Sequence, residues 1–241
     1  MTAELEGRLV FFDLETGGLD PNRHPICEIG AVSVSASTGA TLETFHMLVQ
    51  FDPKEADPRS LSLKKYDPAL WATAAMSPSL VAEYFAQFLR RHATCIRHRA
   101  DGSTYRVAKL AGHNAESFDG PFLRAWYGRL GKYLPAAMSV LDTKQRAMWL
   151  FEEQTQLPRP ENLKLETLAK YFGVTTRPDH TALNDILATA QVYQAIRRQS
   201  VPVTESQQLY LEVLAERTGI TELKLLNQAI NSLVRDLDLA A

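Results

Sequence analysis

The sequence has no apolar run of the roughly 18 residues that a membrane span requires. Its first residues, MTAELEGRLVFFDLE, lack the basic stretch, apolar stretch and small-residue cleavage site of a secretory signal. Cysteine is scarce, since only Cys27 and Cys95 occur and they have no CxxC spacing. These absences predict a cytoplasmic protein with no membrane partner and with reduced, buried thiols; a disulfide between the two cysteines is the alternative.

An excess of basic charge is also missing, because 26 Lys and Arg stand against 28 Asp and Glu, for a net charge of −2. Proteins that coat duplex nucleic acid are usually basic overall, so the composition argues against that class. It does not argue against an enzyme that grips one strand end, because acidic metal ligands offset basic residues in the count. The 241 residues suffice for one α/β domain and a small extra module.

The hydrophobic pattern predicts strands first and then strands that alternate with helices. Strands are expected over residues 8–14, 26–35 and 41–51 as an antiparallel meander, over 94–99 and 104–111 as a hairpin that runs on to His113-Asn114, and over 138–142. Helices are expected over residues 79–92, 117–131, 143–153, 165–172 and 181–199. Residues 52–76 are expected to be irregular, because Pro53, Pro58 and Pro68 break any long helix. This order predicts an α/β fold with a mixed central sheet flanked by helices.

The last forty residues differ from the rest, and we predict a main domain over residues 1–199 and a helical extension over 200–241. An extended segment over 200–204 precedes two amphipathic helices, 205–217 and 221–237, with a helix stop at Thr218-Gly219. The stretch VPVTESQQLYLEVLAERTGIT resembles ribbon-helix-helix proteins, which implies an intertwined dimer; a helical hairpin packed on the main domain is the favoured reading. Either way, eight apolar side chains need burial, some of them in another subunit: Leu209, Leu211, Val213, Leu214, Leu225, Leu226, Ile230 and Leu233.

Two carboxylates, Asp13 and Glu15, lie at the end of the first expected strand. Residues i and i+2 of a strand point to the same face, so both side chains project together where the strand opens into a glycine-rich loop. Two neighbouring acids repel each other and are costly to desolvate, and a divalent cation such as Mg²⁺ or Mn²⁺ removes that cost. A solvated strand end is the alternative interpretation.

Three further residues are candidates with simpler alternatives. Asp119, in AGHNAESFDGPFL, falls at a helix start, where an acid also interacts favourably with the helix dipole. His180 and Asp185, in DHTALNDILATAQVY, are offset by somewhat more than one helical turn, so both can face a common cavity. An ordinary surface histidine is the alternative for His180.

Read together, the segments FFDLETGGLD, GHNAESFDGPFL and HTALNDILATAQVY resemble the DEDDh exonucleases, the DnaQ-like family, in the order that the family shows. The resemblance covers residues 8–198 and implies a ribonuclease H-like fold. The HN-x-x-x-FD spacing has one residue more than that of proofreading subunits and is more similar to TREX-type members, which favours a free-standing nuclease.

The resemblance implies hydrolysis of nucleic acid from 3′ ends with two bound Mg²⁺ or Mn²⁺ ions. Asp13 would bridge both ions, Glu15 and Asp185 would hold the ion that binds the attacking water, and Asp119 would help to hold the ion near the leaving oxygen. His180 would take the proton from the water, a role that suits an imidazole of near-neutral pKa.

Neighbouring residues are expected to hold the terminal nucleotide. These are Leu14, Thr16, Gly17, Gly18, Leu19 and Asn114. The glycines would let a strand approach closely, Leu19 could pack on a base, and Asn114 could orient the phosphate, brace the Asp119 loop or simply occupy a turn. Several basic residues could line a strand path or be ordinary solvated surface: Lys64, Lys65, Arg90, Arg91, Arg97, Arg99 and Arg106.

The leading functional hypothesis is therefore a 3′→5′ exonuclease that prefers single-stranded DNA. The same chemistry on RNA is a close rival, since the residues do not indicate whether a 2′-OH is accepted. A proofreading or trimming subunit that works with a polymerase or another partner is a second rival, with the C-terminal segment as a docking or homodimerisation element. A catalytically silent binding module is disfavoured, because all five catalytic positions are filled.

Overall fold

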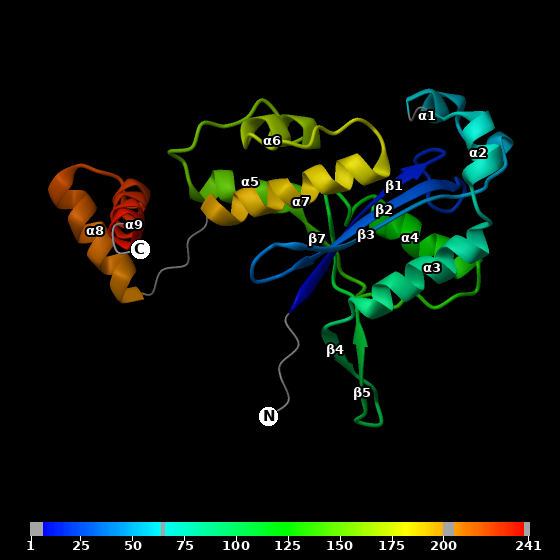
Figure 1. The fold of residues 1–241 in the computed structure, drawn as a ribbon, viewed down its shortest axis with the longest axis horizontal. Coiled ribbons are helices and arrows are strands. Elements are labelled where there is room, and N and C mark those ends of the chain that lie inside the picture. The colour runs from blue at the N-terminus through cyan, green and yellow to red at the C-terminus, as the bar shows by residue number, and fades with distance from the viewer. Residues whose placement is uncertain (1–6, 64–65, 200–204, 239–241) are drawn as a thin grey trace. The chain divides into compact units, whose positions relative to one another are not determined.

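The protein is described by a computed structural model that covers residues 7–63, 66–199 and 205–238. The chain divides into two compact units, Met1–Gln199 and Ser200–Ala241. The first unit contains a five-stranded mixed sheet with helices on both faces (Figure 1), which confirms the predicted fold class. Among the helices of the described ranges, none is long and apolar enough to cross a membrane.

The sheet is built around β1 (Arg8–Thr16), which has partners on both sides. It pairs antiparallel with β2 (Ile26–Ser35), which pairs antiparallel with β3 (Thr41–Leu48), so the predicted meander is confirmed. On its other side β1 pairs in parallel with β6 (Leu110–Gly112), and β6 pairs in parallel with β7 (Leu141–Asp142). The carboxyl ends of three parallel strands therefore meet at one edge of the sheet.

Alternation along β1 decides which side chains face which helices. Val10, Phe12 and Leu14 belong to a core that includes α3 (Pro78–Arg91) and α4 (Asp119–Arg129). Leu9 and Phe11 instead pack with α7 (Ala182–Gln199) on the opposite face. Since successive side chains of a strand alternate, residues 13 and 15 continue the row that faces α7.

Two more helices cover α7 from outside. These are α5 (Thr143–Glu153) and α6 (Leu165–Tyr171), and they share a third hydrophobic cluster with α7. Figure 1 shows the three helices together on one side of the sheet, with α3 and α4 on the other. The helices predicted over residues 143–153, 165–172 and 181–199 are thus confirmed with small shifts at their ends.

Residues 52–76 are more regular than predicted. They form a 3-10 turn, η1 (Pro53–Glu55), and two short helices, α1 (Pro58–Leu63) and α2 (Pro68–Ala74), each of which starts at one of the prolines. A proline is suited to the first helical position because its φ is preset and no N–H is needed there. The absence of a long helix is confirmed, but the prediction of irregular structure was wrong. The third strand also ends earlier than predicted, at Leu48.

The predicted hairpin exists, but it forms a separate two-stranded sheet of β4 (Cys95–His98) and β5 (Thr104–Val107). The strand expected over residues 104–111 is broken, since β5 ends at Val107 and β6 starts at Leu110. Cys27 is buried and Cys95 is half-exposed, and both are free thiols. The prediction that both are buried was wrong for Cys95, because the hairpin that carries it stands away from the core (Figure 1).

The second unit consists of α8 (Glu205–Thr218) and α9 (Glu222–Asp238), so both predicted helices are confirmed. Gly219, at a φ of 69°, follows α8 as the predicted stop. The extended segment predicted over 200–204 lies outside the described residues. Of the eight apolar side chains predicted to need burial, the seven that are described remain exposed or half-buried, and Leu209 is 64% exposed; Leu233 lies outside the described side chains.

Candidate active site

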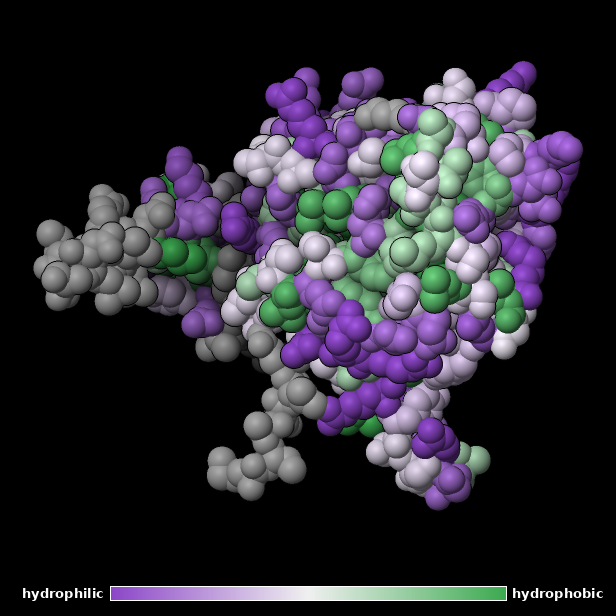
Figure 2. Space-filling model, turned by 45° about the vertical axis from the view of Figure 1, so that its right-hand side comes forward, coloured by the Kyte–Doolittle hydropathy of each residue, from purple (hydrophilic) through white to green (hydrophobic). Residues whose placement is uncertain are grey.

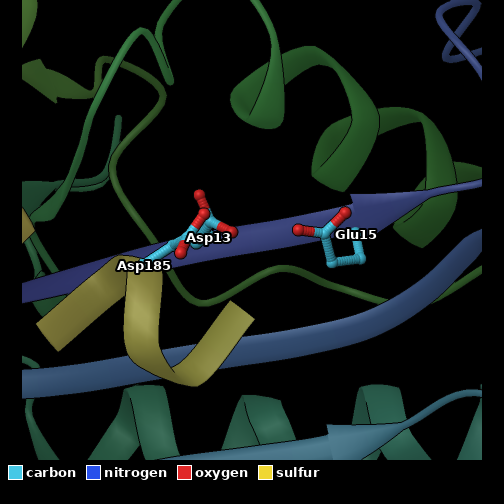
Figure 3. A group of neighbouring side chains, drawn as sticks. All are labelled: Asp13, Glu15 and Asp185. Atoms are coloured by element: carbon cyan, nitrogen blue, oxygen red, sulfur yellow. The ribbon is translucent and has the colours of Figure 1, made fainter. Parts of the chain in front are cut away.

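Three carboxylates converge where β1 meets the start of α7. Asp13, Glu15 and Asp185 each offer one oxygen atom, and these three atoms lie within 4.8 Å of one another. Figure 3 shows Asp185 reaching from the first turn of α7 to Asp13, with Glu15 further along the same strand. Glu15 is buried and the two aspartates are half-buried. The structure therefore unites residues from two segments that are far apart in the sequence.

The electrostatics of this cluster favour a bound cation. Burial raises the pKa of Asp185 above the ordinary aspartate range, although backbone N–H groups of Asp179 and His180 and the nearby His180 ring act in the opposite direction. Asp185 Oδ1 accepts those N–H bonds at 2.9 and 3.3 Å. Crowded, partly desolvated carboxylates are costly without a counter-ion, and hard oxygen donors are what Mg²⁺ and Mn²⁺ prefer. The donor set therefore fits a divalent metal.

The fourth carboxylate, Asp119, is not one of the three whose oxygen atoms lie within 4.8 Å of one another. It is buried at the start of α4, and its Oδ1 atom accepts the backbone N–H of Leu14 at 3.0 Å. This bond ties α4, which covers the opposite face of the sheet, to the stretch of β1 between Asp13 and Glu15. The structure thus places Asp119 beside the strand that carries two of the cluster's acids, with a hydrogen bond to the backbone of that strand.

His180 lies at the mouth of the site rather than among the carboxylates. Its backbone has a φ of 62°, a conformation that is uncommon outside glycine, and its N–H donates to Asp185. Its exposed ring places Nε2 at 3.6 Å from Glu166 Oε1 on α6. The backbone N–H of His180 thus contacts Asp185 and its ring lies toward Glu166, and the expectation that His180 and Asp185 share one cavity stays a prediction.

The loop after β1 uses most of its predicted substrate-binding residues for its own structure. Leu14 is buried in the core, and buried Thr16 donates its hydroxyl to the Gly18 carbonyl at 2.7 Å. A Cβ atom at Gly17 would lie 2.8 Å from the Cβ of Ala56.

A Cβ atom at Gly18 would lie 2.5 Å from the His24 ring. The close approach that these glycines permit is therefore made by the protein itself. In contrast, Leu19 is 80% exposed at the tip of this loop, so its side chain is accessible to a bound nucleotide.

Asn114 is a turn residue with side-chain contacts. Its φ is 60°, its N–H donates to Asp142 at 3.0 Å, and its Oδ1 accepts from Lys144 Nζ at 3.1 Å. Its carbonyl accepts the N–H of Phe118 at 3.2 Å, so it also braces the loop that leads to Asp119. Two of the three predicted roles, turn and brace, are thus confirmed, and the contact with phosphate stays a prediction.

Glu28 is a residue of this site that the sequence reasoning missed. It is buried, it lies opposite Glu15 in the β1–β2 register, and its Oε1 accepts the N–H of Ala182 at 3.0 Å and bonds His46 Nε2 at 2.8 Å. A Cβ at Gly30, two residues along, would lie 2.4 Å from the carbonyl carbon of Ala182. Strand β2 therefore fixes the position of the start of α7. A glutamate inside the apolar run ICEIGAV was the available signal.

The basic residues suggested as a strand path do not gather at the carboxylates. Arg97, Arg99 and Arg106 lie on the β4–β5 hairpin, which projects from the end of the sheet where β1 begins (Figure 1). In Figure 2 this hairpin stands out from the body as a separate lobe with hydrophilic residues at its tip. Arg90 and Arg91 of α3 form ion pairs with glutamates, and Lys64 and Lys65 lie outside the described residues.

The chain is similar in sequence to a known family and to two known proteins. The sequence profile of the family described as Exonuclease (RNase T) matches residues 10–102 and 99–193. DNA polymerase III PolC-type of Caldanaerobacter subterraneus subsp. tengcongensis is 31% identical over 191 residues, which are 79% of this chain and 12% of that protein. The corresponding protein of Clostridium perfringens is 28% identical over 183 residues, which are 76% of this chain and 11% of that protein.

A similar fold occurs in E. coli exonuclease I in complex with a dA16 oligonucleotide. The two structures have a TM-score of 0.66 at 18% sequence identity, over 81% of this chain and 42% of that one. The chain therefore spans less than half the length of these similar proteins. The family profile ends at residue 193, so the unit of α8 and α9 lies outside the matched segment.

Proposed function

Because this chain belongs to the DnaQ-like (RNase T) exonuclease family, we propose that it is a metal-dependent 3′→5′ exonuclease that releases nucleoside monophosphates. The observation that carries this proposal is the meeting of Asp13, Glu15 and Asp185 oxygens within 4.8 Å. Three carboxylates at that spacing bring together the hard oxygen donors that a divalent cation requires.

Asp13, Glu15 and Asp185 would hold two divalent cations, Mg²⁺ or Mn²⁺, and Asp119 would complete the set. Asp13 would touch both ions, Glu15 and Asp185 the ion on the side of the attacking water, and Asp119 the ion on the side of the leaving oxygen. Bound cations would stabilise charge on the scissile phosphate and lower the pKa of the attacking water.

The protein's own residues would position the reactants and move one proton. His180 would accept the proton from the attacking water, and its exposed ring beside Glu166 is open to solvent at the site mouth. Asp185 would hold the His180 backbone in place through its N–H bond. Leu19 would pack against the terminal base from the loop after β1, with Thr16, Gly17 and Gly18 as the backbone support of that loop.

Single-stranded DNA is the proposed substrate, supported by the fold shared with exonuclease I in its oligonucleotide complex. RNA trimming is the alternative. The HN-x-x-x-FD spacing, similar to that of TREX-type enzymes, supports a free-standing nuclease, whereas the similarity to PolC-type polymerases supports a proofreading role with a partner.

A panel of 5′-labelled single-stranded DNA, duplex DNA and RNA, each incubated with the purified chain and Mg²⁺ or Mn²⁺, tests these proposals together. Stepwise shortening of single-stranded DNA from its 3′ end, faster than that of the other two, is the expected result. No shortening of any substrate would refute the nuclease. Shortening only after a polymerase is added would favour the partner-dependent role.

We also propose that residues 200–241 form a docking or homodimerisation element outside the nuclease domain of residues 1–199. Leu209 and Tyr210 of α8 are 64% and 66% exposed, and Ile230 of α9 is 41% exposed. A two-helix unit with such exposed apolar side chains has surface that a partner could cover. Light scattering of the full chain and of a chain truncated before Ser200 tests this; two monomer masses would remove the dimer.

A further inference from the structure

An open groove of about 550 Å³ with both polar and apolar side chains in its walls lies beside the carboxylate site. Its walls come from the turn after β6, the first turn of α5 and the residues that lead into α6. The two sites adjoin, because α6 also carries Glu166, whose carboxylate is 3.6 Å from the His180 ring. The groove is lined by the polar side chains of His113, Asn114, Lys144, Asn162 and Lys164 and by the apolar side chains of Leu163 and Leu165.

Most of the free polar side-chain positions in this groove are hydrogen-bond donors. Asn114 Oδ1 already accepts from Lys144 Nζ at 3.1 Å. Asn162 Oδ1 accepts the Lys164 main-chain N–H at 2.9 Å and the Thr167 hydroxyl at 2.8 Å. Asn162 therefore keeps only its NH₂ group, Asn114 keeps its NH₂ group and one acceptor position, and each lysine adds an ammonium group. Because donors predominate, the groove favours a ligand that presents acceptors.

The side chains that line the groove carry positive charge, and the Asp142 carboxylate lies behind them, where it accepts the main-chain N–H groups of Asn114 and Lys144 at 3.0 and 2.9 Å. Of the described residues that line it, none is a carboxylate. His113 adds no charge, because burial lowers its pKa and its ring nitrogens bond the Thr143 hydroxyl at 2.9 Å and the Leu163 carbonyl at 3.0 Å. The two lysines therefore place positive charge in the groove. The acidic active site lies beside it, less than one helical turn further along α6.

We propose that this groove binds the phosphodiester backbone of the strand whose 3′ end occupies the carboxylate site. The inference rests on the proposed exonuclease function and adds to it the surface that holds the strand upstream of the cleaved bond. Phosphate oxygens are acceptors only and carry the negative charge that two ammonium groups complement. Such contacts position a strand without reading its sequence, so the groove predicts tight but sequence-independent binding.

The test compares Lys144→Gln, Lys164→Gln and the double variant with Lys170→Gln, an exposed lysine of the same helix α6 that does not line the groove. Each protein is assayed on a single-stranded oligothymidylate and on the p-nitrophenyl ester of thymidine 5′-phosphate, which is too short to reach the groove. For the oligonucleotide we expect KM to rise roughly tenfold per lysine, because hydrogen bonds to charged groups are the strong class. The logarithm of the binding constant falls linearly with the logarithm of the salt concentration, and the slope of this line should become less steep by about 0.7 for each lost phosphate contact.

Loss of oligonucleotide affinity with retained turnover of the short ester, absent in Lys170→Gln, would support the groove. An active wild type whose KM and salt dependence are unchanged in the double variant would overturn the groove and leave the exonuclease proposal intact. A wild type that hydrolyses neither substrate would overturn the exonuclease; fluorescence anisotropy with the same oligonucleotide in EDTA then decides the groove. Equal affinity of wild type and double variant in that assay would refute it.

Lys144→Gln also removes the bond to Asn114, so it could disturb the turn as well as the charge. Lys164→Gln keeps the main-chain bond to Asn162 that orders the groove wall. An effect confined to Lys144→Gln, with an altered thermal unfolding curve, would therefore count against phosphate binding and in favour of a local structural role.

Discussion

At each end of the central sheet a carboxylate–histidine pair with one buried member lies at a helix end, but the two ends differ in charge balance. At one end Glu28 bonds His46 and the first N–H of α7. At the other end Glu43 bonds His92, the residue that ends α3, at 2.8 Å.

The far end is neutralised by its own arginines. Arg91 forms a 2.5 Å ion pair with Glu43, and Arg8 bonds the other ring nitrogen of His92 at 3.2 Å. The hydrogen bond from Arg91 lowers the pKa of Glu43 despite partial burial. At the near end burial raises the pKa of Asp185, and Asp13 and Glu15 crowd it further. At the far end, neighbouring arginines neutralise the carboxylate, so this charge has a structural role. At the near end, negative charge remains in excess, and a bound cation would neutralise it.

The largest effect that would test this contrast is expected from Asp13→Asn, which removes a ligand from the acidic end. We expect nuclease activity to fall by about 10³-fold or more, because metal ions supply several kcal/mol of stabilisation and about 1.4 kcal/mol is a factor of ten. Initial rates on single-stranded DNA with Mn²⁺ measure it. Asp101→Asn, an exposed acid on the β4–β5 hairpin, is the matched control and should retain full activity; equal rates for both variants would contradict the assignment.

Asp185→Asn tests whether the raised pKa reports a metal site. Its folded pKa lies above the unfolded one, so the carboxylate favours folding below the unfolded pKa and this advantage is lost as pH rises through the folded pKa. At pH 7 in EDTA the variant should be as stable as wild type or more so, since the amide oxygen can keep the N–H bonds.

With metal at 100 times its Kd, wild type should gain about 2.7 kcal/mol and Asp185→Asn much less. Urea unfolding with EDTA and with MnCl₂ measures both gains. An undiminished Mn²⁺-dependent gain in the variant would show that Asp185 holds no metal.

Glu28 should act on catalysis through the start of α7. Glu28→Ala removes the acceptor for the Ala182 N–H, and we expect kcat to fall by about 10–100-fold, the usual cost of losing a residue that orients metal ligands. Glu28→Gln keeps an acceptor oxygen and should restore most of kcat while KM stays near wild type. If Ala and Gln variants were equally impaired, the bond to α7 would not be the cause.

The smallest effect is expected at the balanced end. Glu43→Gln should leave nuclease activity unchanged and reduce the unfolding free energy at pH 7 by about 0.5–1 kcal/mol, because the ion pair is partly exposed. A loss of nuclease activity in this variant, with the fold intact, would show that the end of the sheet with Glu43 is not purely structural.

The pH dependence sharpens the same contrast. The pKa of Glu43 is lowered by Arg91 and that of His92 by burial, so both contribute stability that is lost as pH falls below their ordinary values of about 4.3 and 6.5. Acid unfolding curves of Glu43→Gln should lack the loss below about pH 4.3 and keep the loss that His92 causes at higher pH. Identical curves for wild type and variant would mean that Glu43 does not titrate differently in the folded protein.

Much of the nuclease unit follows from local pattern. The alternation of Leu9, Phe11, Asp13 and Glu15 along one strand face predicts both the strand and the shared direction of its two acids. Apolar periodicity likewise placed the helices within a few residues of their observed ends. The prolines of residues 52–76 led to the wrong prediction of irregular structure. A proline is excluded from a helix interior but is well suited to a helix start.

The parts that could not be predicted depend on contacts between distant segments. The bond from Ala182 to Glu28 spans 154 residues. The sequence pattern around neither residue therefore predicts it. The projection of the β4–β5 hairpin away from the carboxylates, and the groove of Lys144 and Lys164, depend in the same way on how elements pack.

By itself the sequence determined the family, the order of elements and which residue types carry the chemistry, because motifs and apolar periods are local properties of the chain. Only the tertiary structure decided that Asp185 joins Asp13 and Glu15 while Asp119 bonds the backbone and the His180 ring lies toward Glu166. These placements depend on which helix packs on which face of β1, and that packing arises from burial of side chains contributed by the whole domain.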